Sequence, residues 1–316
     1  MAFIRFLISP FYKISPVLQA AILMIIACLV LSAMAGLIRF MADTGMHTFE
    51  IVFLRNLAGL LYFLPWFFRN GLGVLKTKRI GAYCLRSFVG FFSMVSWFYA
   101  ISVLPLADAV ALNFTAPIFG TILAVFVLKE MVGIRRTLAM LVGFSGAMII
   151  LRPGFTELSL GAYAAIFSAL TMAFAVMMVK LLSRTERPAA IVAWTQILIL
   201  PMSLIPAIFV WEMPTTEQII AILMIGFLAT LGHLCFTKAY ALADATVVMP
   251  FDFFRLIFSA LIGFIFFMQQ PDIFTYIGAA VIFASSIYIA IREAKKSKAE
   301  REVLARTKAE TRIGPT

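Results

Sequence analysis

The tetrapeptide L-A-D-A occurs twice in this chain, at Leu106–Ala109 and at Leu242–Ala245, 136 positions apart. Each copy is followed by an apolar stretch, a short polar turn and a second apolar stretch that ends in arginine, at Arg152 and Arg292. These two arginines are 140 positions apart. The shared register predicts a duplicated unit of about 140 residues, slipped by about four residues within one helix.

The composition places this unit in a membrane. Hydrophobic residues make up 63% of the 316 residues and charged residues 13%, whereas soluble domains have roughly 45–50% apolar and about 25% charged residues. With a window of about 20 residues, the sequence predicts ten apolar helical spans, five in each copy. Their ranges are 17–41, 47–68, 81–104, 107–128, 135–151, 159–182, 188–210, 216–240, 246–268 and 272–291.

Lysine and arginine are divided unevenly between the two ends of these spans. Of the 26 basic residues, 21 fall on one side, three lie within spans, and Arg39 and Arg152 fall on the other side. The positive-inside rule then places both termini in the cytoplasm. Because five is an odd number, the two copies cross in opposite directions. We therefore expect an all-α membrane protein with ten transmembrane helices as two inverted five-helix repeats, an arrangement that recurs in secondary transporters.

The remaining composition adds no further chemistry. We expect a cytoplasmic N-terminal segment, two repeats and a charged cytoplasmic tail, over residues 1–16, 17–156, 157–293 and 294–316. The net charge of +11 follows the topology of the membrane spans, so no nucleic-acid partner is expected. The three cysteines fall inside apolar spans without metal-ligand or disulfide spacing, which predicts small buried hydrophobes. Neither a metal site nor a cofactor is expected.

Six spans carry a stripe of small or polar residues at helical spacing, namely spans 1, 3, 4, 6, 8 and 9. The longest stripe runs through the eighth span, over Gly226, Thr230, His233, Thr237 and Tyr240. A stripe of this kind either lines a polar cavity or lets helices approach closely. Six stripes together favour a central cavity. His233 itself fits a structural hydrogen bond or a proton relay.

Ionisable residues inside the spans need a reason to be there, since each costs about 2.5–3.5 kcal/mol at mid-helix. Arg255 lies near mid-depth with Asp252 one turn before it. This spacing fits a local ion pair, a grip on a substrate carboxylate or phosphate, or both. Arg55 lies deep in the second span, with Glu50 as a candidate partner, whereas Arg86 can snorkel to the surface. The excess of arginine favours an anionic or zwitterionic ligand.

Motifs in both halves resemble a known family. F-E-I-V-F-L-R at Phe49–Arg55 and G-F-S-G at Gly143–Gly146 resemble the first EamA-type domain of the drug/metabolite transporter superfamily. The run A-D-A-T-V-V-M-P-F-D-F-F-R-L at Ala243–Leu256, with I-G-A-A-V-I at Ile277–Ile282, resembles the second. The resemblance covers about residues 17–293 and implies inverted five-helix repeats with a cavity lined by helices 1, 3, 4, 6, 8 and 9.

The resemblance also narrows the class of transporter. The chain is most similar to an alphaproteobacterial branch that includes uptake proteins for S-adenosylmethionine and riboflavin, while other relatives export amino acids or metabolites. Arg55 and Arg86 match positions common in that branch, which fits roles in folding or gating. The family's second domain usually carries an acidic residue where this chain has Gln269-Gln270, whereas Glu130 holds the equivalent place in the first. The chain therefore departs from a symmetric pair of carboxylate locks.

The sequence thus predicts a secondary transporter of a small organic metabolite in a bacterial inner membrane, acting by alternating access as a monomer or weak homo-oligomer. An exporter of the same fold is the alternative. A channel is disfavoured because no charged ring or carbonyl filter is evident, and an intramembrane enzyme because H-E-x-x-H and G-x-S-x-G motifs are missing. The expected substrate contacts are Trp97, Asn113, His233, Tyr240 and Arg255. The candidates for coupling or gating are Asp252, Arg55, Arg86 and Glu50.

Overall fold

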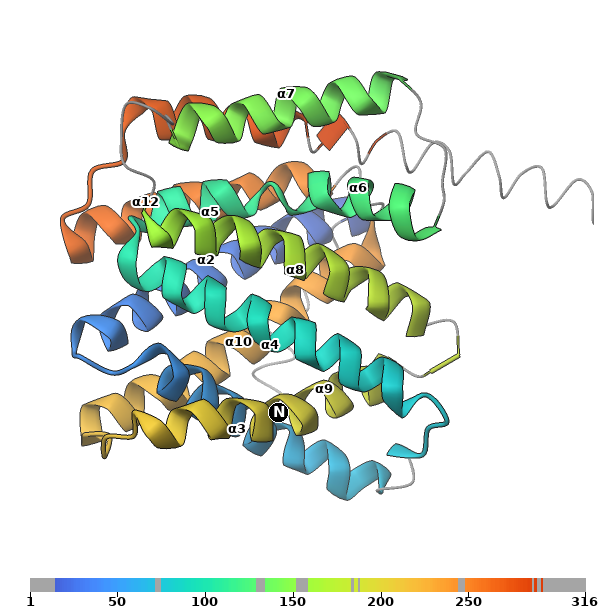
Figure 1. The fold of residues 1–316 in the computed structure, drawn as a ribbon, viewed down its shortest axis with the longest axis vertical. Helices are drawn as coiled ribbons and strands as arrows, with labels where there is room; N and C mark the ends of the chain where they lie inside the picture. Colours follow the sequence, from blue (N-terminus) through green and yellow to red (C-terminus); the bar gives the residue numbers. More distant parts are fainter. Residues whose placement is uncertain are drawn as a thin grey trace, which may run out of the picture.

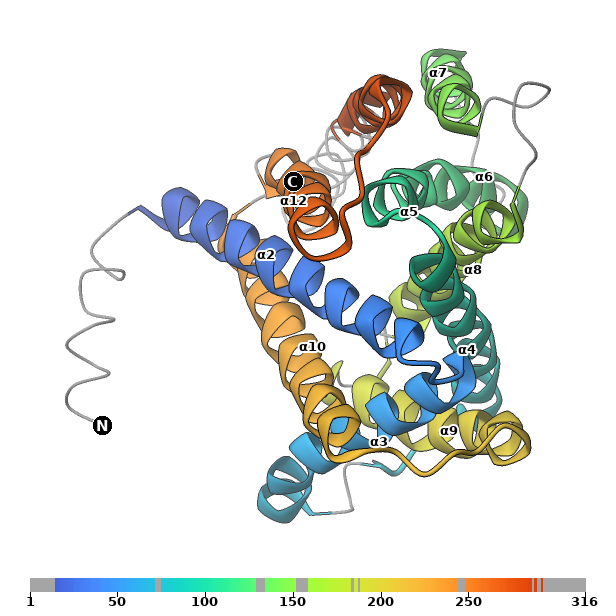
Figure 2. The same cartoon turned by 90° about the vertical axis from the view of Figure 1, so that its left-hand side faces the viewer.

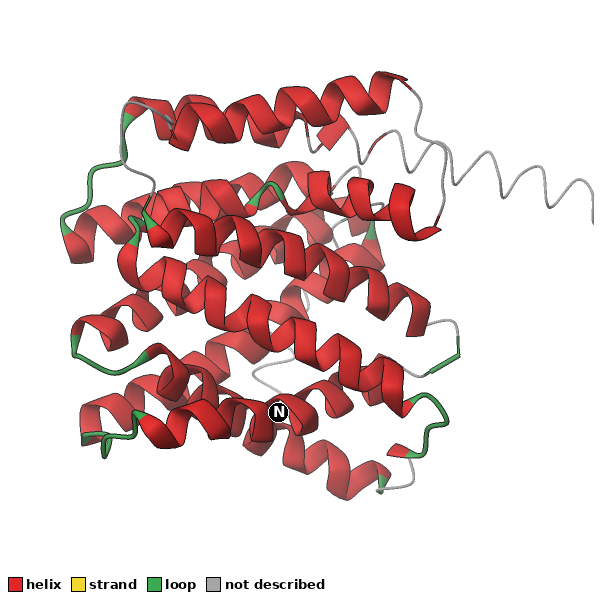
Figure 3. Ribbon diagram, in the orientation of Figure 1, coloured by secondary structure: helices red, strands yellow, loops and turns green. Residues whose placement is uncertain are grey.

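The computed structural model describes residues 15–71, 75–128, 134–151, 159–182, 185–186, 188–243, 248–285, 287–288 and 291. These residues are helical with short connections, and no strand occurs among them (Figures 1 and 3). The first repeat contains α2 (Pro16–Asp43), α3 (Thr48–Asn70), α4 (Ile80–Val103), α5 (Leu106–Asn113), α6 (Ala116–Leu128) and α7 (Ile134–Leu151). The second contains α8 (Leu160–Leu182), α9 (Pro188–Phe209), α10 (Thr216–Leu242), η3 (Met249–Phe253), α12 (Phe254–Phe267) and a helix over Ile273–Ser285.

All ten predicted spans are helical within the described residues, which confirms the predicted fold class. Five of them are long and apolar enough to cross a membrane, namely α2, α4, α8, α9 and α10. Large apolar side chains stand exposed on the outside of the bundle, as Ile134 on α7 and Phe266 on α12 show. A surface of this kind suits lipid, and the chain is a multi-pass membrane protein.

The fourth span differs from the prediction because it is broken between α5 and α6. Pro117 has no N–H with which to continue the helical hydrogen bond to the carbonyl of Asn113. The chain instead turns at Phe114 and Thr115, where the Thr115 hydroxyl donates to the carbonyl of Leu112 at 2.6 Å. The ninth span is also in two pieces, since the short 3₁₀ helix η3 precedes α12. Both breaks lie in the spans that the inverted repeat relates to each other.

The helices pack in pairs that a twofold exchange of the repeats interconverts. α2 packs along α10, and α8 packs along α4 in the same way. Likewise α10 packs on α3 as α4 does on α9, and α12 packs on α2 as α6 does on α8. We call α2 with α10 the first arm and α4 with α8 the second arm. Figure 2 shows the two arms on opposite sides, with α3 and α9 at one end between them.

Serines in four of the predicted stripes bind one helix to another. Ser93 on α4 bonds with Ser168 on α8, and Ser259 on α12 donates to the hydroxyl of Ser32 on α2 at 3.0 Å. All four side chains are buried. At these four positions the stripes are therefore packing surfaces. The hypothesis that the stripes line a cavity therefore concerns their other polar residues.

Loops at the two ends of the bundle define two faces. The face at which α2 and α4 end carries Arg39, and we call it the Arg39 face. The opposite face carries Arg79, the residue that directly precedes α4. In Figure 1 these two faces lie at the left and the right ends of the horizontal helices. Arg79 donates to Thr185 at 3.0 Å, so α4 is tied to the end of α8 on this face.

Candidate functional site

The start of α12 carries the ion pair that the sequence suggested. Arg255 Nη2 lies 3.4 Å from Asp252 Oδ2, and the two side chains are 23% and 24% exposed. The backbone at Arg255 is fixed to α2, because the Ser32 hydroxyl donates to the Arg255 carbonyl at 3.1 Å. The Cys28 thiol also approaches Asp252 Oδ1, at 3.7 Å. The local ion pair is therefore present, and α2 holds it at the boundary between the repeats.

Arg255 also lies over an aromatic ring of the other repeat. Its Cζ is 5.1 Å from the centroid of Phe114, the residue at which α5 ends. Phe114 stacks with Phe253 at 6.4 Å between centroids, and Phe283 lies 4.6 Å from Phe253. We call Phe114, Phe253 and Phe283 the aromatic cluster. A guanidinium over a ring is attracted by the electrons of the ring face, so the break in the fourth span places this ring where it holds a cation.

The aromatic cluster was missed in the sequence because phenylalanine is abundant here, with 32 copies. Two local signals mark it. Phe253 lies between Asp252 and Arg255, and Phe114 lies within the Asn-Phe-Thr-Ala-Pro stretch where the helix breaks. Neither signal reveals that the two rings meet.

His233 and Tyr240 on α10 share the electrostatic environment of Arg255. His233 is exposed, and the charges of Arg55 and Arg255 both act on its ring. Tyr240 is half-buried against Phe236, at 4.9 Å between ring centroids, and the charges of Asp252 and Arg255 act on its hydroxyl. Tyr240 also packs in the apolar cluster of Cys28 and Phe254, beside the Asp252–Arg255 pair, and both α10 residues stay predicted substrate contacts.

The other two predicted contacts are placed differently. Asn113 is half-buried at the end of α5, next to Phe114. Trp97 on α4 packs between the two largest apolar clusters of the bundle. Asn113 thus adjoins the aromatic cluster, whereas Trp97 is positioned first as a packing residue.

Glu50 does not pair with Arg55, contrary to the candidate partnership. Its carboxylate is 1% exposed and accepts from the backbone N–H groups of His47 at 3.2 Å and Glu212 at 2.7 Å. The first bond caps α3, and the second ties α3 to the loop between α9 and α10. A spacing of five residues does not align side chains on one helix face, so the nearby backbone donors take the carboxylate. Arg55 instead donates to Asn56 Oδ1 at 3.1 Å.

Three arginines keep an unused donor among the described residues. The Nε atoms of Arg55, Arg86 and Arg255 are each buried and have no hydrogen-bond partner there. Buried polar groups in native proteins are nearly always satisfied by protein, water or ligand. At the start of α12, Asp252 pairs with Arg255, whose Nε keeps its unused donor among the described residues. An incoming anion or polar carbonyl finds ready donors.

Comparison with known proteins identifies the class. The EamA-like transporter family matches residues 18–152 and again residues 159–291. This chain belongs to that family. The duplication in the family match agrees with the paired packing of the EamA repeats. Among the described residues, no group of three or more His, Cys, Asp or Glu side chains is placed to hold a metal ion.

Relatives of this EamA protein are named transporters. The riboflavin transporter of Vibrio cholerae is 31% identical over 290 residues, covering 90% of this chain and 97% of that one. The S-adenosylmethionine uptake transporter of Rickettsia prowazekii is 28% identical over 259 residues, covering 82% and 88%. The pseudopaline exporter CntI of Pseudomonas aeruginosa is 27% identical over 275 residues, covering 85% and 95%. A solved structure shares the fold, with a TM-score of 0.58 at 16% identity over 88% of this chain and 98% of that one.

Proposed function

We propose that this EamA protein is a secondary transporter in a bacterial inner membrane, with both termini cytoplasmic, that carries a small organic metabolite between the repeats by alternating access. The observation that carries the proposal is Arg255, which lies over Phe114 and keeps a buried Nε without a partner. It joins a cation of the second repeat to a helix break of the first. The family match and the transporter names of the relatives support the class.

The chemistry of the site favours a planar, partly unsaturated metabolite with an anionic, zwitterionic or carbonyl-bearing edge. The aromatic cluster offers ring faces for stacking, and Arg255 offers donors in the fork that suits carboxylates and carbonyl groups. α6 and α12 both begin at breaks, and the positive ends of half-helices favour negative charge in transporter sites. Riboflavin and S-adenosylmethionine, the compounds in the relatives' names, both carry a fused heteroaromatic ring.

Each predicted site residue takes a role in this proposal. Asn113, His233 and Tyr240 bind the polar edge of the metabolite, and Trp97 supports the wall behind Phe114. Asp252 neutralises Arg255 until the metabolite arrives. The metabolite then competes with Asp252 for the guanidinium. Arg55 and Arg86 supply the positive field, whereas Glu50 fixes the scaffold.

The first test is a thermal-shift screen of the purified protein with riboflavin, S-adenosylmethionine, amino acids and dicarboxylates. A ligand that binds only the folded state at 100 times its Kd stabilises it by about 2.7 kcal/mol. We expect a shift in the wild type that Arg255→Ala loses and that Lys76→Ala, an exposed loop variant, retains. A shift that Arg255→Ala keeps in full would remove this residue from the site.

The transport claim needs its own measurement. The ligand that shifts the melting temperature is loaded outside proteoliposomes, and its uptake is followed against concentration. Saturable uptake that Arg255→Ala abolishes supports a carrier. A flux that rises linearly with concentration contradicts it and favours a channel.

A further inference from the structure

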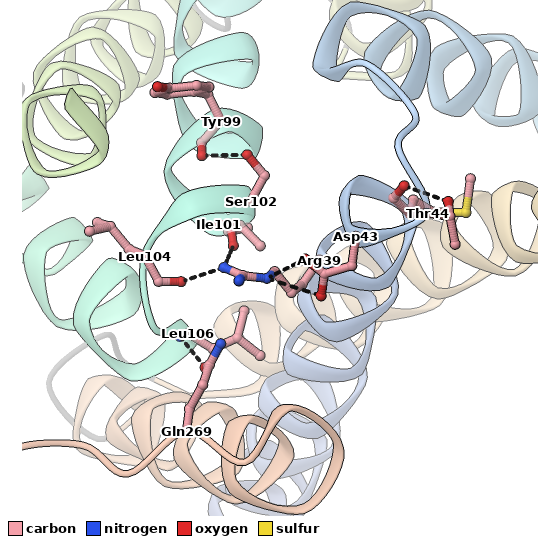
Figure 4. A network of polar contacts seen from close by, with 10 residues as sticks. Arg39, Asp43, Thr44, Tyr99, Ile101, Ser102, Leu104, Leu106 and Gln269 are labelled. Carbon is pink, nitrogen blue, oxygen red and sulfur yellow. Dashed lines mark hydrogen bonds and ion pairs between the residues drawn. The ribbon is translucent and has the colours of Figure 1, made fainter. Parts of the chain in front are cut away.

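The corner between α4 and α5, at Leu104–Leu106, is held by two side chains from outside its own helices (Figure 4). Arg39 Nη1 on α2 donates to the carbonyl of Leu104 at 3.1 Å and to that of Ile101 at 3.4 Å. From the opposite direction, Gln269 Oε1 accepts from the backbone N–H of Leu106 at 2.9 Å. One partner therefore comes from the first repeat and the other from the second.

These contacts use backbone groups that a helix end leaves without a partner. The last carbonyls of α4 and the first N–H groups of α5 have no intrahelical bond. The free carbonyl groups at the end of α4 attract a cation, and the free N–H groups at the start of α5 attract a carbonyl oxygen. The contacts at the corner are therefore favourable by charge as well as by geometry. Arg39 makes two of these bonds and Gln269 one, and a rotation of either side chain removes its contact with the corner.

The Arg39 side chain and the Gln269 backbone are both held by contacts outside the corner. Arg39 Nε donates to Asp43 at 3.1 and 3.3 Å, one turn along the same helix. Gln269 follows the left-handed residue Met268, with φ at 53°, and its backbone N–H bonds to the carbonyl of Gly263 at 2.9 Å. The Arg39 side chain and the Gln269 backbone therefore do not depend on the corner for their positions. The corner is what they hold.

The corner belongs to the second arm, whereas Arg39 belongs to the first. A Cβ at Gly161 of α8 would lie 2.9 Å from Leu104 Cγ, so α8 fits closely against the corner. Across the Arg39 face, α2 therefore meets α4 through Arg39. The symmetry that relates the two repeats places the equivalent of this contact between α8 and α10. Within the described parts of those two helices, α8 and α10 do not pack on each other as α2 and α4 do.

We propose that Arg39 and Gln269 form an outer latch, which closes the site towards the Arg39 face and has to release before the metabolite can pass on that side. The proposal rests on the proposed transport function and on the orientation that places Arg39 outside. Within the described residues, α2 packs on α4 and Arg39 binds the corner, whereas α8 and α10 do not pack on each other in this way. This asymmetry is the one expected of a carrier closed to the outside. A static cap of two helix ends is the competing account.

The test measures access to the site and needs no substrate. Thr230 on α10 lies one turn from His233, and its hydroxyl bonds only within its own helix, to Gly226 at 2.9 Å. Thr230→Cys is made in full-length protein with Cys84 and Cys235 changed to serine and the buried Cys28 retained. Intact cells are treated with an impermeant, negatively charged methanethiosulfonate, and the same protein without Thr230→Cys gives the background.

The latch variants are Arg39→Gln and Gln269→Leu. We expect each to raise the rate of modification at position 230 by about tenfold, a factor equal to about 1.4 kcal/mol in the closing equilibrium. Gln269→Glu keeps an acceptor for Leu106 and should stay slow. Arg79→Gln is the matched control, because it removes the same kind of guanidinium bond, to Thr185, on the opposite face. It should leave modification from outside unchanged.

The outcomes separate the latch from a static cap and from the transport claim. Slow modification in both latch variants, with monodisperse protein in detergent, overturns the latch. Faster modification in Arg79→Gln alone overturns the assignment of the Arg39 face to the outside. If Arg39→Gln does not fold, Asp43→Asn is used in its place, because it removes the carboxylate that holds the Arg39 side chain. A failed uptake assay with fast modification in the latch variants contradicts the proposed function and leaves the latch standing.

Discussion

Ser93 and Ser168 each donate a hydroxyl hydrogen bond to the backbone carbonyl of the other, at 3.1 and 3.0 Å. Ser93 lies on α4 and Ser168 on α8, so the two bonds join the helices of the second arm across the two repeats. Both side chains are buried, at 6% and 2% exposure. The pair is a reciprocal clasp between two membrane helices.

Removing either hydroxyl should weaken the packing of the second arm without changing the binding of the metabolite. Ser93→Ala and Ser168→Ala are each expected to cost about 0.6 kcal/mol, the average for polar contacts between membrane helices. The two changes should be less than additive in a double-mutant cycle, measured by denaturation in detergent. Binding of the metabolite per folded molecule should not change. If binding falls while stability holds, these serines line the site.

Glu50 is expected to be a structural residue of the scaffold. Glu50→Ala leaves two backbone N–H groups without their acceptor, at about 1–3 kcal/mol for each that stays buried. Glu50→Gln keeps an amide oxygen for the Glu212 N–H and should lose less. The measurement is the melting temperature of both variants, with uptake per folded molecule as the control. A large loss of uptake in Glu50→Gln at normal stability would instead support gating.

Close packing between α7 and the last described helix should make Gly278 intolerant of a side chain. A Cβ at Gly278 would lie 2.5 Å from the carbonyl oxygen of Gly146, and backbone cannot move aside as a side chain can. We expect Gly278→Ala to destabilise the protein by about 1–3 kcal/mol. Gly81→Ala is the control, because its Cβ would meet nothing within 4 Å. Equal melting temperatures for the two variants would contradict this helix contact.

Phe114 should contribute to binding through its ring and not only through its volume. Phe114→Leu removes the face beneath Arg255, and a cation–π contact is worth about 0.5–2 kcal/mol. We expect a loss of affinity of about tenfold, whereas Phe114→Tyr should bind nearly as the wild type does. Phe92→Leu removes an exposed ring that meets Phe88 edge to face and serves as control. Titration of the ligand found by thermal shift gives the constants.

The architecture was predictable because features that extend over many residues determine it. Apolar length, the repeat of L-A-D-A and the side bias of lysine and arginine each survive over many residues, so errors at single positions do not matter. The Asp252–Arg255 pair was also predictable, since the two residues are three positions apart in one predicted span, although the structure divides them between η3 and α12. The break at Phe114 was within reach, because Pro117 signals it, but a hydropathy window averages across such a turn.

Contacts between distant segments could not be predicted from one sequence. Gln269 was recognised as a departure from an acidic position, yet its bond to Leu106 joins residues that only the fold brings together. Arg39 was treated as one of the few basic residues on its side, and the carbonyls that it binds carry no sequence signal at all. The partnership of Arg55 with Glu50 was wrong because free backbone N–H groups at a helix start compete well for a carboxylate.

The composition of the two arms also sets the order in which this protein is able to assemble. α2 precedes the other described helices in the chain, yet its main partner α10 begins only at Thr216, after the described helices of the first repeat and two helices of the second. Until then Ser32 and the small residues that α2 packs against α10 face lipid or the insertion machinery. α2 therefore lacks its main partner through most of synthesis, so cells lacking factors that shelter such a helix should accumulate this protein poorly.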